Sequence, residues 1–406
     1  SFWLFWFVPY FVLSAFQLLL FTHSMSKTFL YSLAFIALGL ISGSIGPTLP
    51  ALAAQTHVEM RQISNLFVAR ALGTMVGSWL IGRVYDKVRG HPVLAASLLA
   101  SALAMALLPM SGQLLMAIVL SACIGLASAS INVGGNALIV MEHGDRVRPF
   151  MGVMHFAFGL GGFLAPMFVS LFADRSDGLR LTYWVLALLS LPPMVMVLIS
   201  TSPPLCVAHH DDAKAATPGL LPGLLAVYFF LEVGAEASVM GWIFSYAVQQ
   251  GIAIPEAYKI NSGFWAAFTV GRLATIWLSM RFAALPLALL FMGMATLFVV
   301  GLLIFPISAT LVWICALGFG VSVAPVFPSM FGFAQNRLHL SGKVTGLFLV
   351  GASAGGMFWP RLIGQFFESH GAQAMAWAVA GTLIGALVLI LAITVPARLK
   401  RNIAES

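Results

Sequence analysis

Long apolar stretches, separated by short polar loops, constrain this chain more than any other feature. Twelve of them are present, at about 28–50, 60–82, 91–110, 113–141, 148–173, 180–201, 218–248, 257–280, 283–306, 308–335, 342–367 and 372–397. A hydrocarbon core about 30 Å thick requires roughly 20 apolar residues per helix. Inside lipid, every backbone polar group must also be hydrogen-bonded within the protein. The pattern therefore predicts an all-α membrane protein with twelve transmembrane helices.

Charge is scarce and unevenly distributed along these stretches. The 406 residues are 60% hydrophobic and 8% charged, whereas soluble domains contain about 25% charged residues. If the loops alternate in side, only Arg61, Arg175, Arg180 and Lys259 fall opposite the other loop cations. The positive-inside rule then places both ends of the twelve-helix body in the cytoplasm. We expect a multi-pass protein of a cell membrane, specifically a bacterial inner membrane, and no nucleic-acid partner for the net charge of +7.

An internal repeat indicates that the helices form two similar halves. The sequence of residues 152–172 is partly repeated at residues 346–366. Five residues are identical 194 positions apart: Gly152 and Gly346, Gly161 and Gly355, Gly162 and Gly356, Pro166 and Pro360, and Phe172 and Phe366. A membrane chain built from two similar halves usually carries its working site between them.

The repeat and one polar linker set the predicted domain boundaries. We expect a six-helix bundle at 25–201, a cytoplasmic linker at 202–217, a second six-helix bundle at 218–397 and a basic cytoplasmic tail at 398–406. Residues 1–24 form a further apolar stretch without Lys or Arg, unlike the basic start of a signal peptide. This stretch is either a genuine extension or sequence translated from upstream of Met25.

Two carboxylates, Glu232 and Glu236, lie within a predicted span, that of the seventh helix. Their spacing of four places them on one helical face. Each intramembrane charge costs several kcal/mol unless it is paired, hydrated or neutralised. Both residues are candidates for ion coupling, since a carboxyl can bind a proton or hold a cation. The alternative is a structural pair neutralised by a nearby arginine.

Three arginines also fall within predicted spans. Arg70 and Arg272 occupy similar contexts on the second and eighth helices. Each could pair with a carboxylate or donate hydrogen bonds to a solute, and snorkelling to the interface is the alternative. Arg361 lies midway between loops and also requires a partner or water.

Further polar and aromatic groups are candidates for solute contacts. Asn132 and Asn136 share a face of the fourth helix, and amides both donate and accept hydrogen bonds, as sugar hydroxyls do. His155 could carry a proton or bind a hydroxyl, or be a structural histidine. Trp242 could stack on a sugar ring, although most aromatic residues in such a chain lie in the core or at the lipid interface.

The loop between the second and third helices reads GRVYDKVRGH at 82–91. Gly82, Asp86 and Lys87 resemble the cytoplasmic loop signature of the major facilitator superfamily, although Arg89-Gly90 reverses the usual order at its end. By this resemblance, Asp86 would hold neighbouring helix ends together in the outward-facing state, pairing with arginine and helix N-termini. A simple turn and helix cap is the alternative.

Other motifs narrow the resemblance. INVGGN (131–136), MHFAF (154–158), VGAE (233–236), GWIF (241–244) and PVFPSMF (325–331) resemble the fucose permease-like branch, and most of all its sodium-dependent glucose transporter-like members. The resemblance covers about 28–397. That branch has an acidic residue where Asn132 stands, and Glu236 matches a seventh-helix acid of the glucose transporter-like members. Either the coupling carboxylate has moved to the second half, which we prefer, or transport is uncoupled.

The resemblance implies a secondary transporter with two pseudo-symmetric six-helix bundles around a central site. We expect a monomer that takes up a small-molecule cargo, a monosaccharide or polyol, with H⁺ or Na⁺ and without a cofactor or bound metal. Coupling would rest on Glu236 and Glu232, and cargo contacts on Asn132, Asn136, His155, Trp242 and Arg272. The alternative is an exporter of amphipathic or drug-like compounds by cation antiport. An enzyme is not expected, because the chain has no His-Glu-x-x-His or Gly-x-Ser-x-Gly motif.

Overall fold

The computed structural model describes residues 27–85, 87–204, 220–338 and 342–405, and these ranges are helical without a β-strand. Each of the twelve predicted stretches coincides with one helix or with two consecutive ones. Ten of the described helical segments are long and apolar enough to cross a membrane, and α4 and α10 are not among them. The all-α membrane fold is confirmed, and the count of twelve spans is consistent with these helices.

The helices of the first half are α2 (Lys27–Gln55), α3 (Met60–Ile63), α4 (Asn65–Tyr85), α5 (Gly90–Leu107), α6 (Leu114–His143), α7 (Val147–Phe172) and α8 (Gly178–Ile199). Those of the second half are α9 (Leu221–Gln249), α10 (Ile254–Arg281), α11 (Ala284–Ile304), α12 (Ala309–Val323), α13 (Val326–Gln335), α14 (Gly342–His370) and α15 (Gln373–Glu405). The stretch 308–335 is divided at Pro325, which precedes α13, because proline lacks the N–H that would continue the helix.

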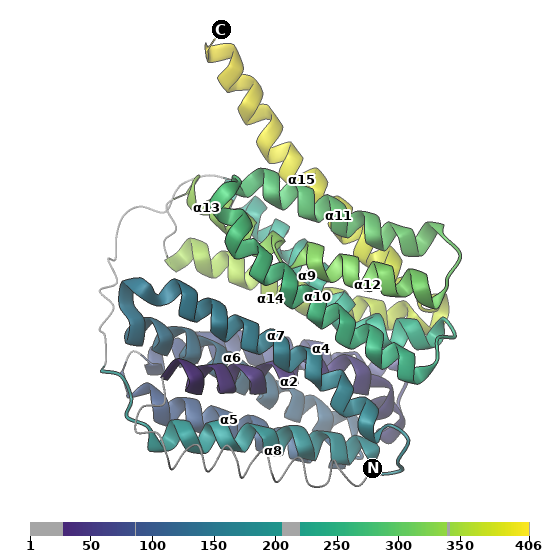
Figure 1. Ribbon diagram of the computed structural model, residues 1–406. Coiled ribbons are helices and arrows are strands. Elements are labelled where there is room, and N and C mark those ends of the chain that lie inside the picture. Colours follow the sequence, from purple (N-terminus) through teal and green to yellow (C-terminus); the bar gives the residue numbers. More distant parts are fainter. Residues whose placement is uncertain (1–26, 86, 205–219, 339–341, 406) are drawn as a thin grey trace.

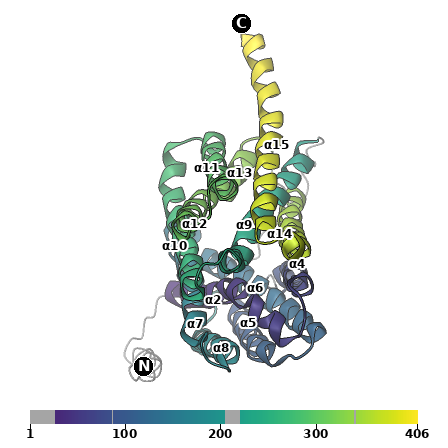
Figure 2. The same cartoon turned by 90° about the vertical axis from the view of Figure 1, so that its right-hand side faces the viewer.

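The helices form two bundles that lie side by side (Figure 1). In the first bundle α4 packs on α6, α2 on α7 and α5 on α8; in the second α14 packs on α9, α10 on α12 and α11 on α15. The last turns of α15 project beyond the bundles in both views (Figure 2). The predicted domain boundaries remain predictions; residues 1–24 and most of the linker lie outside the described ranges.

The sequence repeat corresponds to repeated helix packing. A Cβ on Gly161 of α7 would overlap the carbonyl oxygen of Ile36 in α2. A Cβ on Gly355 of α14 would overlap the carbonyl oxygen of Phe230 in α9. Ile36 and Phe230 are themselves 194 positions apart, like the two glycines. The two bundles therefore share the same close helix crossing, which only glycine permits.

The two ends of the bundles differ in their connections. One end carries α3 and is called the α3 end; the other carries residues 200–204, which follow α8, and is called the linker end. The bundles touch each other through α7 and α10, α4 and α14, α2 and α9, and α3 and α14. Because α3 lies at one end only, its contact with α14 joins the bundles at the α3 end.

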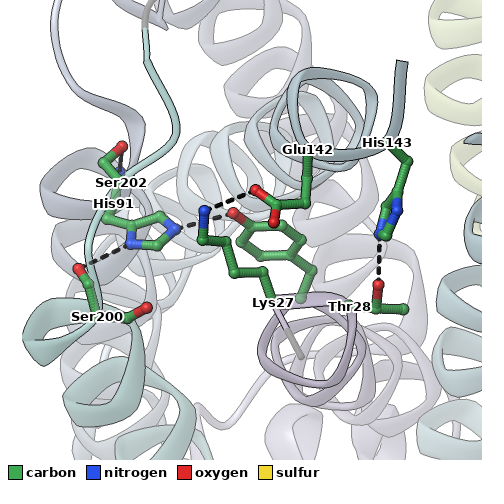
Figure 3. A network of polar contacts seen from close by, with 8 residues as sticks. Lys27, Thr28, His91, Glu142, His143, Ser200 and Ser202 are labelled. Carbon is green, nitrogen blue, oxygen red and sulfur yellow. Dashed lines mark hydrogen bonds and ion pairs between the residues drawn. The ribbon is translucent and has the colours of Figure 1, made fainter. Parts of the chain in front are cut away.

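At the linker end, His91 forms hydrogen bonds that link three elements of the first bundle (Figure 3). His91 Nδ1 lies 3.0 Å from the Ser200 carbonyl oxygen, and Nε2 lies 2.9 Å from the Tyr31 hydroxyl. Because a carbonyl only accepts, Nδ1 carries the proton and Nε2 accepts from the hydroxyl of Tyr31. The His91 N–H also donates to Ser202 Oγ at 3.3 Å. These bonds join α2, α5 and the segment that follows α8.

Two further contacts tie α2 to the end of α6 (Figure 3). Lys27 Nζ lies 2.7 Å from Glu142 Oε2, and Thr28 Oγ1 lies 2.7 Å from His143 Nε2. The His143 ring stacks on Phe150 of α7 with centroids 3.6 Å apart. All these contacts stay within the first bundle, so they hold the elements of its linker end together without joining them to the second bundle.

Candidate functional site

The two predicted coupling carboxylates occupy different surroundings on α9. Glu232 is 0% exposed, and neither carboxyl oxygen has a hydrogen-bond partner. Glu236, one turn further on, is partly exposed. No hydrogen bond or ion pair joins it to another described residue. A carboxylate enclosed without a partner is costly, so Glu232 must be protonated or accompanied by a cation.

Arg272 of α10 lies near both carboxyls without pairing with either. Its guanidinium interacts electrostatically with Glu232 and Glu236. Its Cζ lies 4.7 Å from the ring centroid of Phe268, and its Nε is buried without a hydrogen-bond partner. None of the three ion pairs between described residues includes Arg272. The acids and the arginine therefore keep unused donors and acceptors close together.

His155 brings the first bundle to this charged group. It lies on α7 and interacts electrostatically with Arg272 of the other bundle. Its ring meets Phe35 of α2 edge-on, with centroids 5.6 Å apart. The Phe35 ring lies where a Cβ on Gly135 of α6 would be. His155 therefore brings α7 to the charged residues of α9 and α10, and Phe35 of α2 and Gly135 of α6 pack behind its ring.

The two amides on α6 form a pair next to Gly135. Asn136 Nδ2 donates to Asn132 Oδ1 at 2.8 Å and to the Asn132 carbonyl oxygen at 2.9 Å. The Asn132 side chain is exposed, and its N–H donors have no partner among the described residues. The pair can therefore offer free donors in a fixed orientation to a hydroxyl-bearing solute.

The sequence pointed to Arg272 on α10, but Asn261 on the same helical face was missed. Asn261, Trp265, Phe268 and Arg272 follow one another at helical spacing on a single face of α10. Both polar side-chain atoms of Asn261 are buried without a partner, as is the indole Nε1 of Trp265. The spacing of Asn261 from Arg272 was visible in the sequence, but the absence of partners was not.

Trp242 does not join the other predicted solute contacts. Its side chain is 0% exposed, and its Nε1 donates to the Pro360 carbonyl at 3.0 Å. Its ring packs between Phe67 and Phe367, with centroids 6.0 and 4.7 Å away. Since both its donor and its ring faces are engaged, Trp242 closes the contact between the bundles here.

The remaining arginines have partners of their own. Arg70 donates to the Ile41 carbonyl at 3.2 Å and to Ser42 Oγ at 3.4 Å, within the first bundle. Arg361 finds the partner that its position required: its Nε donates to Asn65 Oδ1 at 2.6 Å, across the two bundles.

The predicted gating motif lies at the linker end. Gly82 belongs to the last turn of α4, and Lys87 is exposed after it. Asp86 lies outside the described residues, so its predicted role stays a prediction.

One depression of the surface lies away from these residues. It measures ≈ 390 Å³ at the α3 end, between the α9–α10 and α11–α12 loops. Its acid, Glu256, already accepts hydrogen bonds from Trp313 at 2.6 Å and Lys259 at 3.3 Å. Because this carboxylate is engaged, the better candidate site is the unpaired group around Arg272.

Known proteins share the sequence pattern and the fold of this chain. The sequence pattern of the Major Facilitator Superfamily matches residues 28–360. The chain is 29% identical over 356 residues to sodium-dependent glucose transporter 1 of Xenopus laevis, covering 79% of this chain and 72% of that protein. It is 28% identical over 383 residues to sodium-dependent glucose transporter 1A of Mus musculus, covering 82% and 87%.

Solved structures share the fold at low sequence identity. The nucleoside transporter NupG superposes with a TM-score of 0.77 at 14% identity, covering 90% of this chain and 98% of that one. A bacterial homologue of the human lysosomal transporter Spinster gives a TM-score of 0.70 at 12% identity, covering 90% of this chain and 93% of that one.

Because the family pattern matches most of the chain, the chain belongs to the Major Facilitator Superfamily and is a multi-pass membrane transporter, not an enzyme.

Proposed function

We propose that this transporter moves a monosaccharide or small polyol by alternating access, coupled to H⁺ or Na⁺. The observation that carries the proposal is the group formed by Glu236, Arg272 and His155, which comes from both bundles and contains no closed ion pair. A neutral, hydroxyl-bearing solute matches this mixture of donors and acceptors. The names of the similar glucose transporters support the same class of cargo.

Glu236 is the proposed coupling residue. It is partly exposed, has no hydrogen bond or ion pair to another described residue and lies near Arg272 of α10, so its carboxyl is free to bind a proton or cation. A cation bound at Glu236 would weaken the electrostatic attraction between Glu236 and Arg272. It would thereby change the affinity of the site for the solute. Glu232 would support it as a second, fully enclosed carboxyl.

We further propose that the α3 end faces outward and the linker end faces the cytoplasm. The four loop cations of the α3 end are Arg61, Arg175, Arg180 and Lys259, and most of the other loop cations lie toward the linker end, as the positive-inside rule requires. With the bundles hydrogen-bonded to each other at the α3 end, this conformation is the inward-facing one. One chain supplies both bundles, so we expect a monomer to suffice.

Solute binding by purified protein tests the proposal. Ligands that bind the folded state raise the melting temperature, so the protein is screened against hexoses, polyols and lipophilic cations, each with and without Na⁺ and at two pH values. We expect stabilisation by a hexose or polyol, confirmed by counterflow of that labelled solute in proteoliposomes. Stabilisation and counterflow by lipophilic cations alone would contradict a sugar transporter and favour the exporter.

A further inference from the structure

The hydrogen bonds that cross between the bundles are concentrated at one end. Between described residues there are three, and all join α14 to the segment 60–65. Arg361 Nε donates to Asn65 Oδ1 at 2.6 Å. Gln365 Nε2 donates to the Arg61 carbonyl at 3.2 Å. The Met60 N–H donates to Glu368 Oε1 at 2.8 Å.

These donors and acceptors form one line along α14. Arg361, Gln365 and Glu368 are separated by four and three residues, so they share a face of the helix. That face lies against α3 and the start of α4. Each of the three side chains holds a different group of the opposite bundle, so the contact extends over about two helical turns.

Close packing accompanies the hydrogen bonds. A Cβ on Gly364 would overlap Ser64, which is 0% exposed. A Cβ on Gly46 of α2 would lie 2.7 Å from the Met240 carbonyl oxygen of α9. The contact is closely packed around Ser64, while the hydrogen bonds of Gln365 and Glu368 lie at its exposed rim. All three hydrogen bonds must break before the bundles can separate there.

The linker end has the opposite character. Its polar contacts, centred on His91 and on Lys27 with Glu142, stay within the first bundle (Figure 3). Among the described residues no hydrogen bond or ion pair joins the bundles at that end. The hydrogen bonds between the bundles therefore lie at the α3 end, whereas toward the linker end the described residues of the two bundles meet by packing alone, as where a Cβ on Gly152 of α7 would lie 3.2 Å from Ile276 Cδ1 of α10.

The internal repeat marks a matching position in the first half. Glu368 follows Pro360 by eight residues, and Asp174 follows Pro166 by eight residues. Asp174, just after α7, lies close enough to Tyr258 of α10 in the opposite bundle for its charge to be felt there. Both repeats therefore place an acid at the α3 end, near the other bundle.

We propose that Arg361, Gln365 and Glu368 form a gate that closes the α3 end. The transporter can open at the α3 end only after the three hydrogen bonds of these residues are broken. They are positioning residues that hold the bundles together without touching the solute. The gate's role in transport rests on the proposed alternating access, but its opening can be measured without any solute.

A buried reporter in the contact measures opening directly. Ser64→Cys is introduced into a background in which Cys123, Cys206 and Cys315 are replaced by serine. Its reaction rate with a membrane-impermeant maleimide is followed in nanodiscs. One lost hydrogen bond shifts an equilibrium by about fivefold. We therefore expect Glu368→Ala and Arg361→Leu each to raise the labelling rate by about fivefold or more.

Two variants separate gating from general damage. Glu368→Gln keeps an acceptor for the Met60 N–H, so its labelling rate should stay near that of the parent. Ser369→Ala alters the next residue, whose Oγ bonds only within its own helix, and should leave labelling unchanged.

A second probe covers the case in which the reporter itself perturbs the contact. Amide hydrogen exchange of residues 60–64, in protein with its native Ser64, should quicken in Glu368→Ala and Arg361→Leu and stay unchanged in Ser369→Ala. Unchanged exchange and labelling in both gate variants, at an unaltered melting temperature, would overturn the proposal. A failure of sugar binding would overturn the proposed cargo instead and leave these rates unaffected.

Discussion

The charged side chains between the bundles are held near one another without neutralising one another in closed pairs. Arg272 interacts electrostatically with Glu236, yet no hydrogen bond or ion pair joins these two residues. A closed ion pair would use the same donors and acceptors that a solute needs, and separating it inside the protein would be costly. The open arrangement leaves the donors and acceptors of both residues free for the cargo and ion binding that we propose.

Neutralising Glu236 should separate coupling from transport. In Glu236→Gln the side chain keeps its shape and its hydrogen-bonding oxygen but can no longer exchange a proton or hold a cation by charge. We expect accumulation against a gradient to be lost while solute exchange between two equal pools persists. Uptake and exchange are measured with labelled solute in proteoliposomes.

Glu142→Gln is the matched control for this variant. It removes the ion pair with Lys27. The Lys27 side chain is 25% exposed and that of Glu142 27% exposed, and ion pairs near the surface contribute about 0–1 kcal/mol to stability. Its accumulation should resemble that of the parent. Concentrative uptake at the parental level in Glu236→Gln would refute coupling through this residue.

The amide pair of α6 should affect affinity more than stability. Asn132→Leu removes exposed donors, so the melting temperature should change little. The loss of one or two hydrogen bonds to solute should raise KM by roughly fivefold to tenfold. Gln113→Leu, an exposed amide at the other end of α6, is the control and should leave KM unchanged. An unaltered KM in Asn132→Leu would remove Asn132 from the site.

At the scale of the helices, glycine decides which pairs can approach closely. Gly161 on α7 meets α2, and Gly355 on α14 meets α9, each over a backbone carbonyl. In lipid such contacts rest on van der Waals packing and on close backbone approach. These two helix pairs are therefore the equivalent inner cores of the two bundles.

Substitution at one of these crossings should loosen a bundle. In Gly161→Ala the added methyl group overlaps the Ile36 carbonyl, so α7 and α2 must move apart. Overpacking of this kind costs about 1–3 kcal/mol, and we expect a lower melting temperature. Gly346→Ala is the control, because nothing lies within 4 Å of its Cβ. Equal melting temperatures for the two variants would contradict the close crossing.

For the whole molecule, interfacial residues agree with the proposed orientation. Arg83 lies over the ring of Trp79 and Arg281 over that of Trp277, at 4.0 and 4.4 Å. Both pairs end helices at the linker end, and the tryptophans are 64% and 48% exposed. Tryptophan rings are enriched at membrane–water interfaces, and cationic residues are enriched in cytoplasmic loops.

Labelling from each side of the membrane tests this orientation. In the cysteine-free background, Gly112→Cys between α5 and α6 should react with an impermeant maleimide added to intact cells. Ala283→Cys between α10 and α11 should react only after permeabilisation. Both positions are exposed in loops, so access alone decides the outcome. The reverse pattern would invert the assignment of inside and outside.

Local chemistry allowed much of this fold to be predicted from the sequence. The apolar lengths located the helices, because a helix satisfies its own backbone in lipid. The repeat located two halves, and Glu232 with Glu236 stood out because charge within a span is costly. The pairing of Arg361 with Asn65 could not be predicted, because the two residues are 296 positions apart and meet only when the bundles pack.

The sequence by itself determined the helices and the presence of two acids within an apolar stretch, since each depends on residues close together in the chain. The repeat added the division into two halves. Only the tertiary structure decided which polar groups remain unpaired and which end is closed. Trp242 illustrates the difference: its chemistry suits a sugar ring, but packing against Phe67 and Phe367 and the bond to Pro360 enclose it. Partners from distant segments settle such roles, because hydrogen bonding and burial depend on what the fold brings together.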